Sequence, residues 1–439
     1  MRPNARTALV ALALTAAVAC EDDSTGQSSP SASAAPDAPA ATVLRAEVER
    51  ERPAPIGDDA LAPFVDGQRD FALDLLRRVD ADSDNVLFSP FSIHQALALT
   101  FAGARGETRE AMSRALRTGA DDAAFHQACN ALERRLEQPP GDRDGEGAAP
   151  LFRTANALFT QDDLPVKDAF LETLGRNYGA GVWRVDFAQA TEEARASINQ
   201  WVSDGTEARI PNLLLPGDVD QATRMVLVNA VYFLADWSTP FDASATWEQP
   251  FHAPGGDAST AFMHGRMDLA VAETDTALAV EIPYGDETMS LLVVQPKGSL
   301  ADYTAGFDRA ALEGIEDALT YEPVDLALPR FELRARLSLR SVLVAMGMGP
   351  AFGEGQEADF SGISEQPLAI SRVIHEAWVR VDEKGTEAAA ATAVLLDAGA
   401  AFEPEPARSV VIDRPFLLLL RHRPTGALLF VGRILDPQG

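Results

Sequence analysis

Apolar residues recur at helical spacing in the first part of the chain. Residues 64–76 place them three and four positions apart, which predicts an amphipathic helix. A short apolar run at 85–88 predicts a strand, and the Ser-Pro pair after it predicts the start of a helix that ends between Gly103 and Gly106. Further helices are predicted over residues 108–116, 121–136 and 191–205.

Runs rich in branched and aromatic residues predict strands between and after these helices. Residues 224–234 are almost continuously apolar and have the length of a strand, which favours a strand buried on both faces. Other strands are predicted at 155–159, 181–187, 277–283, 289–295, 324–333, 415–420 and 428–434. No internal repeat is found. Helices mixed with many strands predict one large α+β domain with extensive sheet, over residues 61–439.

The segment that begins at Thr386 alternates with a period of two. One face is small or apolar throughout, whereas both charged residues, Glu387 and Asp397, fall on the other face. This pattern predicts a strand with one face against a core. Alanine is depleted in strands, so a short alanine-rich helix starting near Thr386 is the alternative. Residues 397–408 predict an exposed loop, so the segment could be a strand in one state and part of a loop in another.

Charge and motif content narrow the classes of function. The 439 residues include 37 basic and 66 acidic ones, a net charge of −29, which argues against nucleic acid or an anionic membrane surface as a partner. The six histidines show no metal-ligand spacing, and no Gly-x-Ser-x-Gly, His-Glu-x-x-His or phosphate-binding glycine motif occurs. We therefore expect no cofactor, no metal site and no hydrolase centre, and we expect a monomer.

The N-terminus predicts export. Arg2 and Arg6 precede an apolar run at 8–19 that is too short to span a membrane. Small residues before Cys20 are typical of a lipoprotein cleavage site, so residues 1–20 are predicted to be a signal peptide and Cys20 to carry a lipid; ordinary signal cleavage near Ala19 or Cys20 is the alternative. Membrane contact would then occur only through this lipid. The protein is expected to be a cell-envelope lipoprotein or extracellular.

Residues 21–60 and the second cysteine complete the N-terminal prediction. The stretch 21–60 is rich in Pro, Ala and Ser and lacks enough apolar surface to order itself, so it predicts a disordered tether. If Cys20 is lipidated, Cys129 is left without a cysteine to pair with.

Nine blocks, in order along the chain from about residue 61 to the C-terminus, resemble the serpin family. They are 85–92 with Gly103, 226–233 with Trp237, 282–284, 328–331, 358–363, His375, 383–392, 415–417 and 421–433. The resemblance implies a serpin fold with three β-sheets, about nine helices and an exposed reactive-centre loop.

The same resemblance implies suicide inhibition of a serine, or sometimes a cysteine, protease. The protease cleaves the loop and forms an acyl-enzyme. The cleaved loop then inserts into the largest sheet, which traps the protease in this acyl-enzyme form. The chain would then be an inhibitor and not an enzyme. The alternative is a non-inhibitory serpin that acts as a protease substrate, binding module or chaperone. The usual sign of that class is bulky, charged or proline residues at inward hinge positions, and none occurs between Gly385 and Thr392.

Three groups of residues take roles from the resemblance. The hinge comprises Glu383, Lys384, Gly385, Thr386, Glu387, Ala388, Ala389, Ala390, Ala391 and Thr392. The shutter, a hydrogen-bonded cluster below the point where the central strands part, comprises Ser89, Ser92, Asn229 and His375. The breach, at the top of the sheet, comprises Trp237, Arg330 and Glu383.

The residues of the hinge suit insertion on physical grounds, but the cleaved bond has two candidates. An inserted strand must not bury a charge, and the small inward residues of this hinge meet that condition. The family's usual loop length, counted from Gly385, places the cleaved bond at Gly399-Ala400, which suits an elastase- or subtilisin-like protease. Counting back from Pro415 places it nearer 402–405, where Phe402 would suit a chymotrypsin-like protease.

Overall fold

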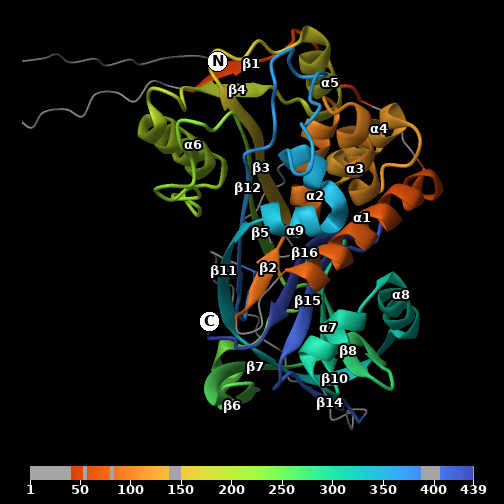
Figure 1. Cartoon of the computed structure of the whole chain (residues 1–439). Coiled ribbons are helices and arrows are strands. Elements are labelled where there is room, and N and C mark those ends of the chain that lie inside the picture. The colour runs from red at the N-terminus through yellow and green to blue at the C-terminus, as the bar shows by residue number, and fades with distance from the viewer. Residues whose placement is uncertain (1–40, 53–56, 80–83, 138–149, 387–405, 439) are drawn as a thin grey trace, which may run out of the picture. The chain divides into compact units, whose positions relative to one another are not determined.

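The computed structural model describes residues 41–52, 57–79, 84–137, 150–386 and 406–438 (Figure 1). Nine α-helices and two hydrogen-bonded networks of strands lie within these residues, which confirms the predicted α+β class. The helices are α1 (Asp58–Arg78), α2 (Pro90–Phe101), α3 (Gly106–Leu116), α4 (Asp122–Leu136), α5 (Asp168–Tyr178), α6 (Thr191–Gly205), α7 (Leu300–Gly306), α8 (Arg309–Ala318) and α9 (Arg340–Leu343).

Local signals explain several of these helix boundaries. Ser89 caps α2, because its Oγ accepts a hydrogen bond from the Ser92 N–H at 3.2 Å, and Pro90 occupies the first turn. Asp121 caps α4 in the same way. Helix α6 has the predicted bounds, whereas α1 starts earlier than predicted, at Asp58.

The first network is a seven-stranded sheet within the described residues. Its strands, in spatial order, are β1 (Thr42–Leu44), β4 (Val182–Val185), β3 (Leu151–Gln161), β5 (Met225–Asp236), β13 (Gly385–Thr386), β12 (Arg372–Val381) and β11 (Phe331–Ser338). We call it the central sheet.

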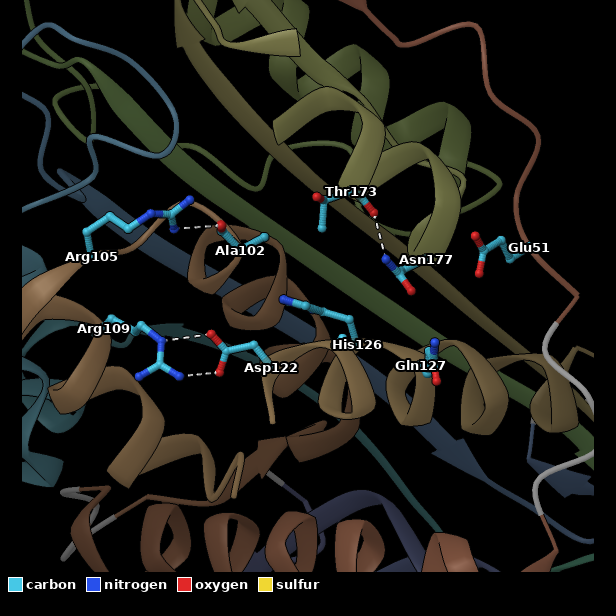
Figure 2. Close-up of a pocket in the computed structure, with 10 residues that line it drawn as sticks. Glu51, Ala102, Arg105, Arg109, Asp122, His126, Gln127, Thr173 and Asn177 are labelled. Atoms are coloured by element: carbon cyan, nitrogen blue, oxygen red, sulfur yellow. Dashed lines mark hydrogen bonds and ion pairs between the residues drawn. The ribbon is translucent and has the colours of Figure 1, made fainter. Parts of the chain in front are cut away.

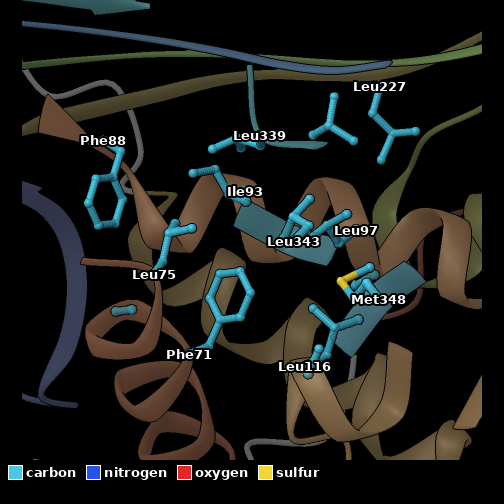
Figure 3. Close-up of a cluster of buried hydrophobic side chains, with 14 of the residues drawn as sticks. Phe71, Leu75, Phe88, Ile93, Leu97, Leu116, Leu227, Leu339, Leu343 and Met348 are labelled. Carbon is cyan, nitrogen blue, oxygen red and sulfur yellow. The ribbon is translucent and has the colours of Figure 1, made fainter. Parts of the chain in front are cut away.

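The two faces of the central sheet are covered by different helices. Val226, Val228 and Ala230 of β5 share a buried cluster with α6. Leu227 points to the opposite face and joins the large cluster that includes α1 and α2, as Figure 3 shows around Phe71. Because side chains alternate along a strand, the apolar run of β5 satisfies both faces, as predicted.

The second network contains nine strands in the described residues. Its order is β14 (Arg408–Val411), β10 (Thr320–Pro329), β7 (Gly256–Glu273), β8 (Ala277–Tyr284), β9 (Met289–Pro296), β15 (Phe416–His422), β16 (Ala427–Ile434) and β2 (Val86–Phe88), with β6 (Thr246–Ala253) paired to β7. Strand β7 pairs with β6 and β10 along most of its length and with β8 only at its end. The network thus has two parts that meet at β7, and with the central sheet they make the three sheets expected.

One predicted strand is wrong as a single element. The apolar run 324–333 divides at Arg330 into β10 and β11, which belong to different sheets. The Arg330 N–H donates to the Ala261 carbonyl, so the pairing to β7 continues up to the division. An apolar run alone does not reveal a change of sheet.

The predicted tether is wrong for residues 41–52, which we call the strap. Thr42–Leu44 pairs antiparallel with β4 at the edge of the central sheet. Arg50 donates to Glu133 of α4 at 2.6 Å and to Glu137, directly after α4, at 2.7 Å. The strap is therefore held by edge pairing and ion pairs. Its own residues include three arginines, three glutamates and no proline, unlike the Pro-, Ala- and Ser-rich stretch before it.

Residues 1–40, with Cys20 among them, lie outside the described residues. In the part of the chain that is described, no helix combines the length and the apolar composition needed to cross a bilayer. Cys129 is a buried free thiol, and burial raises its pKa.

Candidate functional site

The central feature of the site is a short strand seated between two long parallel ones. Strands β5 and β12 pair directly from Arg372 opposite Val226 to Trp378 opposite Tyr232. Beyond this stretch β13 lies between them, antiparallel to both. The first hinge residues therefore already occupy one end of the space between the two central strands.

Gly385 allows this close approach. A Cβ atom at this position would lie 2.0 Å from the carbonyl oxygen of Ala235 and 2.6 Å from Cα of Asp236. Only glycine can bring the backbone of β13 this close to β5.

Thr386 anchors β13 in the core. Its side chain is fully buried, and its hydroxyl lies 2.7 Å from the phenol oxygen of Tyr284. The Tyr284 ring stacks on Trp237, with ring centroids 4.3 Å apart. Burial raises the pKa of Tyr284, so the phenol keeps its proton and can donate to Thr386. The threonine therefore closes a polar contact inside an otherwise apolar cluster.

The predicted breach residues meet at the stem that carries β13. Arg330 Nη1 lies 3.4 Å from Glu383 Oε1, and the Trp237 indole N–H donates to the Asp382 carbonyl at 2.8 Å. Thr246 Oγ1 also donates to Glu383, at 2.7 Å. Because Arg330 is 43% exposed, its ion pair contributes only ~0–1 kcal/mol. Sequence reasoning missed Thr246 and Tyr284, which only tertiary contacts bring to the hinge.

The predicted shutter residues form one buried cluster below the seated strand. The Ser89 N–H donates to His375 Nε2 at 3.0 Å, and the other ring nitrogen of His375 bonds Asn229 Oδ1. Asn229 Nδ2 donates to Ser92 Oγ at 2.5 Å. The cluster thus joins α2 to both β5 and β12 at the level where these strands are still paired.

Asn156 on β3 completes this cluster and was missed from the sequence. Its Oδ1 accepts from Ser92 Oγ at 2.9 Å and also from Asn229 Nδ2. Asn156 faces Asn229 across the β3–β5 pair, so the signal was present as an asparagine inside an apolar strand. The amide of Asn156 is half-buried and needs hydrogen-bond partners, and two elements, α2 and β5, supply them.

His375 is held neutral by its surroundings. Nε2 accepts a backbone N–H, so it carries no proton, and Nδ1 carries the ring proton and donates to Asn229. Full burial lowers the pKa of His375 to about 3. Protonation of Nε2 would break the bond to Ser89 and place a charge in the core.

The remaining predicted site residues lie outside the described residues. They are the hinge positions Glu387, Ala388, Ala389, Ala390, Ala391 and Thr392 and the candidate cleavage positions Gly399, Ala400 and Phe402. The structure therefore places the start of the hinge and its attachments, and the roles of the later positions stay predictions.

A polar pocket of about 450 Å³ lies apart from the hinge, between α3, α4 and α5 (Figure 2). Arg109 and Asp122 form a two-point ion pair at its wall, with Nε to Oδ2 at 2.7 Å. Glu51 of the strap, also at the wall, pairs with Arg176. These charges are satisfied by one another, so the pocket offers no evident centre for chemistry.

Comparisons with known proteins agree with this geometry. Residues 66–437 match the family model described as Serpin (serine protease inhibitor). The chain is 37% identical over 378 residues to an uncharacterized serpin-like protein of Thermococcus kodakarensis, covering 86% of each. It is 36% identical over 387 residues to the leukocyte elastase inhibitor of Sus scrofa, covering 84% of this chain and 97% of that protein. Among solved structures, the thermophilic serpin tengpin in its native state superposes with a TM-score of 0.80 at 27% identity, over 90% of this chain and all of that one.

Proposed function

The chain belongs to the serpin family of protease inhibitors, and we propose that it is a suicide inhibitor of a serine endopeptidase. In this proposal a protease cleaves the segment between Thr386 and Arg408 and is held as the acyl-enzyme. The cleaved segment then continues β13 between β5 and β12. The observation that carries the proposal is that β13 already lies in this space, antiparallel to both strands.

The register of β13 supports continued insertion. Thr386 lies opposite Val381 on one side and Ala235 on the other. In the same register, the next two inward residues would meet apolar neighbours. These would be Phe233 and Val379 for Ala388, and Val231 and Ala377 for Ala390, all buried here. Alanine fills such a site without burying a charge or forcing the strands further apart.

The third inward position would meet the shutter. Six residues beyond Thr386 is Thr392, and its partners in the same register are His375 and Asn229. A threonine hydroxyl can bond to such a cluster, whereas alanine could not. The pattern of polar, apolar, apolar and polar inward residues thus follows the polarity of the sites they would occupy.

Insertion would supply the driving force for trapping. Below β13, β5 and β12 are joined by one set of backbone hydrogen bonds. An inserted strand would replace this set with two, one to each neighbouring strand. Twelve residues at ~3.3 Å each would span about 40 Å. Each added hydrogen bond contributes ~1 kcal/mol net, so the sum would exceed the cost of parting a few parallel pairs.

An elastase- or subtilisin-like protease is the proposed target. The Gly399-Ala400 bond suits a shallow specificity pocket, and the relatives include leukocyte elastase inhibitors. A chymotrypsin-like target that cleaves after Phe402 is the second candidate. We also propose that the protein is exported, with Cys20 lipidated; mass spectrometry of the mature N-terminus would reveal a diacylglyceryl cysteine or, against the proposal, a free one.

One incubation tests the inhibitor proposal. The full chain is mixed with elastase, subtilisin or chymotrypsin, and the products are separated in SDS and measured by mass spectrometry. The expected result is an SDS-resistant complex and a released C-terminal fragment that begins at Ala400, or soon after Phe402. If the chain is cleaved but forms a complex with none of the three proteases, a non-inhibitory serpin is favoured instead.

A further inference from the structure

An exposed face extends across four strands beside the two points where the loop segment attaches. On β6 it carries Trp247 and Gln249, and on β7 it carries His264 and Arg266. Asp325 of β10 and Ser409 and Val411 of β14 continue it, and Ala327 of β10 lies on the same side but is buried. Their strand registers place these residues on the same side of the sheet, and all of them except Trp247 line a hollow of about 380 Å³. We call this surface the four-strand face.

Trp247 is the dominant side chain of the four-strand face. It is 50% exposed, although tryptophan is one of the largest apolar side chains. Its indole stacks on the His264 ring, with centroids 3.6 Å apart and planes 4° apart. His264 is fixed in turn, because Gln249 Nε2 lies 2.9 Å from His264 Nε2 and donates to it. An exposed aromatic ring that is already rigid loses little conformational entropy when a partner covers it.

The four-strand face adjoins both ends of the loop segment. Thr246, the residue before Trp247, donates to Glu383 on the stem of the hinge. Ser409 and Val411 belong to β14, which begins at Arg408, where the chain returns from residues 387–405. Figure 1 shows β6 and β14 at the same end of the molecule, with β7 and β10 between them. We therefore expect a protease that binds the segment between these attachments to lie near this surface.

We propose that the four-strand face is a secondary docking site for the target protease, where Trp247 receives an apolar side chain from the rim of the protease active site. This inference rests on the proposed function and adds a specificity determinant outside the cleaved segment. Small residues, Ala327 and Ser409, leave the hollow beside the aromatic stack into which such a side chain fits. Buried aromatic anchors of this kind dominate many protein interfaces. The face would therefore raise the rate at which the protease engages the loop.

The test measures the second-order rate constant of protease engagement for the full chain and its variants. It uses whichever of elastase, subtilisin and chymotrypsin reacts fastest with the wild-type chain. Trp247→Ala is expected to lower the rate constant about tenfold or more, which is the usual effect of removing an interface anchor. Tyr321→Ala removes another exposed aromatic side chain, 55% exposed on β10, and is the matched control that should leave the rate constant unchanged. A second variant, Ser409→Arg, fills the hollow from an exposed position without removing any packing and should lower the rate constant as well.

The readout separates this inference from the proposed function. Where a covalent complex forms, the rate constant is that of complex formation; where the loop is only cut, it is kcat/KM of cleavage. If the wild-type chain forms no complex but its cleavage rate still falls in Trp247→Ala and Ser409→Arg, the inhibitor proposal is overturned and the docking site is supported. Rate constants within twofold of wild type for both Trp247→Ala and Ser409→Arg would overturn the docking site, whatever the fate of the loop.

Discussion

The hydroxyl of Thr386 and the phenol of Tyr284 lie 2.7 Å apart, and both residues are buried. The two are separated by 102 positions along the chain, so the contact reports how the hinge is seated on the body. It makes Thr386 the last residue of the hinge that is fixed in the described structure. In the proposed mechanism, the segment that a protease must reach begins directly after it.

A double-mutant cycle tests this contact. Tyr284→Phe and Thr386→Val should each lower the free energy of unfolding by ~1–2 kcal/mol. Each removes one of the two hydroxyls and so leaves the other buried without its hydrogen-bond partner. The double variant should cost less than the sum of the two, with a coupling of ~1 kcal/mol. The free energy of unfolding is obtained from denaturant midpoints for the wild type, the two single variants and the double variant. Strictly additive losses would show that the two hydroxyls do not interact.

Paired arginine variants test the direction of the inserted hinge. Ala388→Arg should turn the inhibitor into a substrate, because its side chain would point toward Phe233 and Val379, where a buried charge costs several kcal/mol. Ala389→Arg, one position on, should point outward and keep most of the inhibition. The measurement is the number of inhibitor molecules consumed per protease trapped, together with the melting temperature after cleavage. Equal effects of the two variants would contradict the proposed register.

The sequence predicted how the hinge begins but not what holds it. Period-two alternation from Thr386 predicts a strand, and Thr386 itself lies in β13; the rest of the alternating segment, residues 387–397, lies outside the described residues, so its strand stays a prediction. Tyr284 and Thr246 sit in ordinary strand patterns, whereas Asn156 stands out as an asparagine in an apolar run. All three were missed because only packing brings them to the hinge or the shutter. The local sequence pattern predicts whether a segment is a helix or a strand. It does not predict which residues far apart in the chain come into contact, because those contacts depend on the complete fold.

The strap shows the opposite kind of error. The prediction of disorder treated residues 21–60 as one stretch, because proline and alanine, which offer little apolar surface to bury, are frequent in its first half. Residues 41–52 are ordered by other means, through backbone pairing with β4 and through the Arg50 contacts to α4. A free strand edge and a cluster of acidic residues on a helix are properties of the partner surface, so the strap's own sequence does not reveal them.

Arg50 is expected to hold the strap in place. It contacts Asn130, Glu133 and Glu137, and its side chain is 16% exposed. Burial raises the pKa of Glu133 to about 7, while Arg50 acts to lower it, so removing the guanidinium leaves a partly buried carboxyl without its main cation. Arg50→Ala should lower the free energy of unfolding by ~1–3 kcal/mol. It should also speed proteolysis within residues 41–52.

Arg52→Ala is the matched control for the strap, because Arg52 is exposed. It should leave stability within ~0.5 kcal/mol of wild type, as most surface substitutions do. Limited proteolysis followed by mass spectrometry measures the release of the strap in both variants. Equal protection of the strap in Arg50→Ala and Arg52→Ala would mean that pairing with β4 is sufficient to hold it.

His375 makes the shutter sensitive to acid. Its pKa is lowered by burial to about 3 in the folded chain, against ~6.5 in the unfolded chain. The unfolded state therefore binds the extra proton first as pH falls. The stability that neutral His375 supports is present above pH ~6.5 and is lost progressively as pH falls from there toward the folded pKa. His94 and His126 have pKa values lowered to about 4 for the same reason and add to the same loss.

Replacing His375 separates its contribution to the acid-dependent loss of stability from the contributions of His94 and His126. His375→Asn keeps a hydrogen-bonding group near Asn229 and removes the titration, so its stability should fall less steeply between pH 6.5 and 4 than that of the wild type. The difference approaches one proton, or ~1.4 kcal/mol per pH unit. His252→Asn is the control: His252 is exposed on β6, and Asp257 raises its pKa, so this variant should leave the acid limb as steep as in the wild type. Denaturant midpoints at several pH values provide the curves, and parallel curves for His375→Asn and wild type would place the acid sensitivity elsewhere than in the shutter.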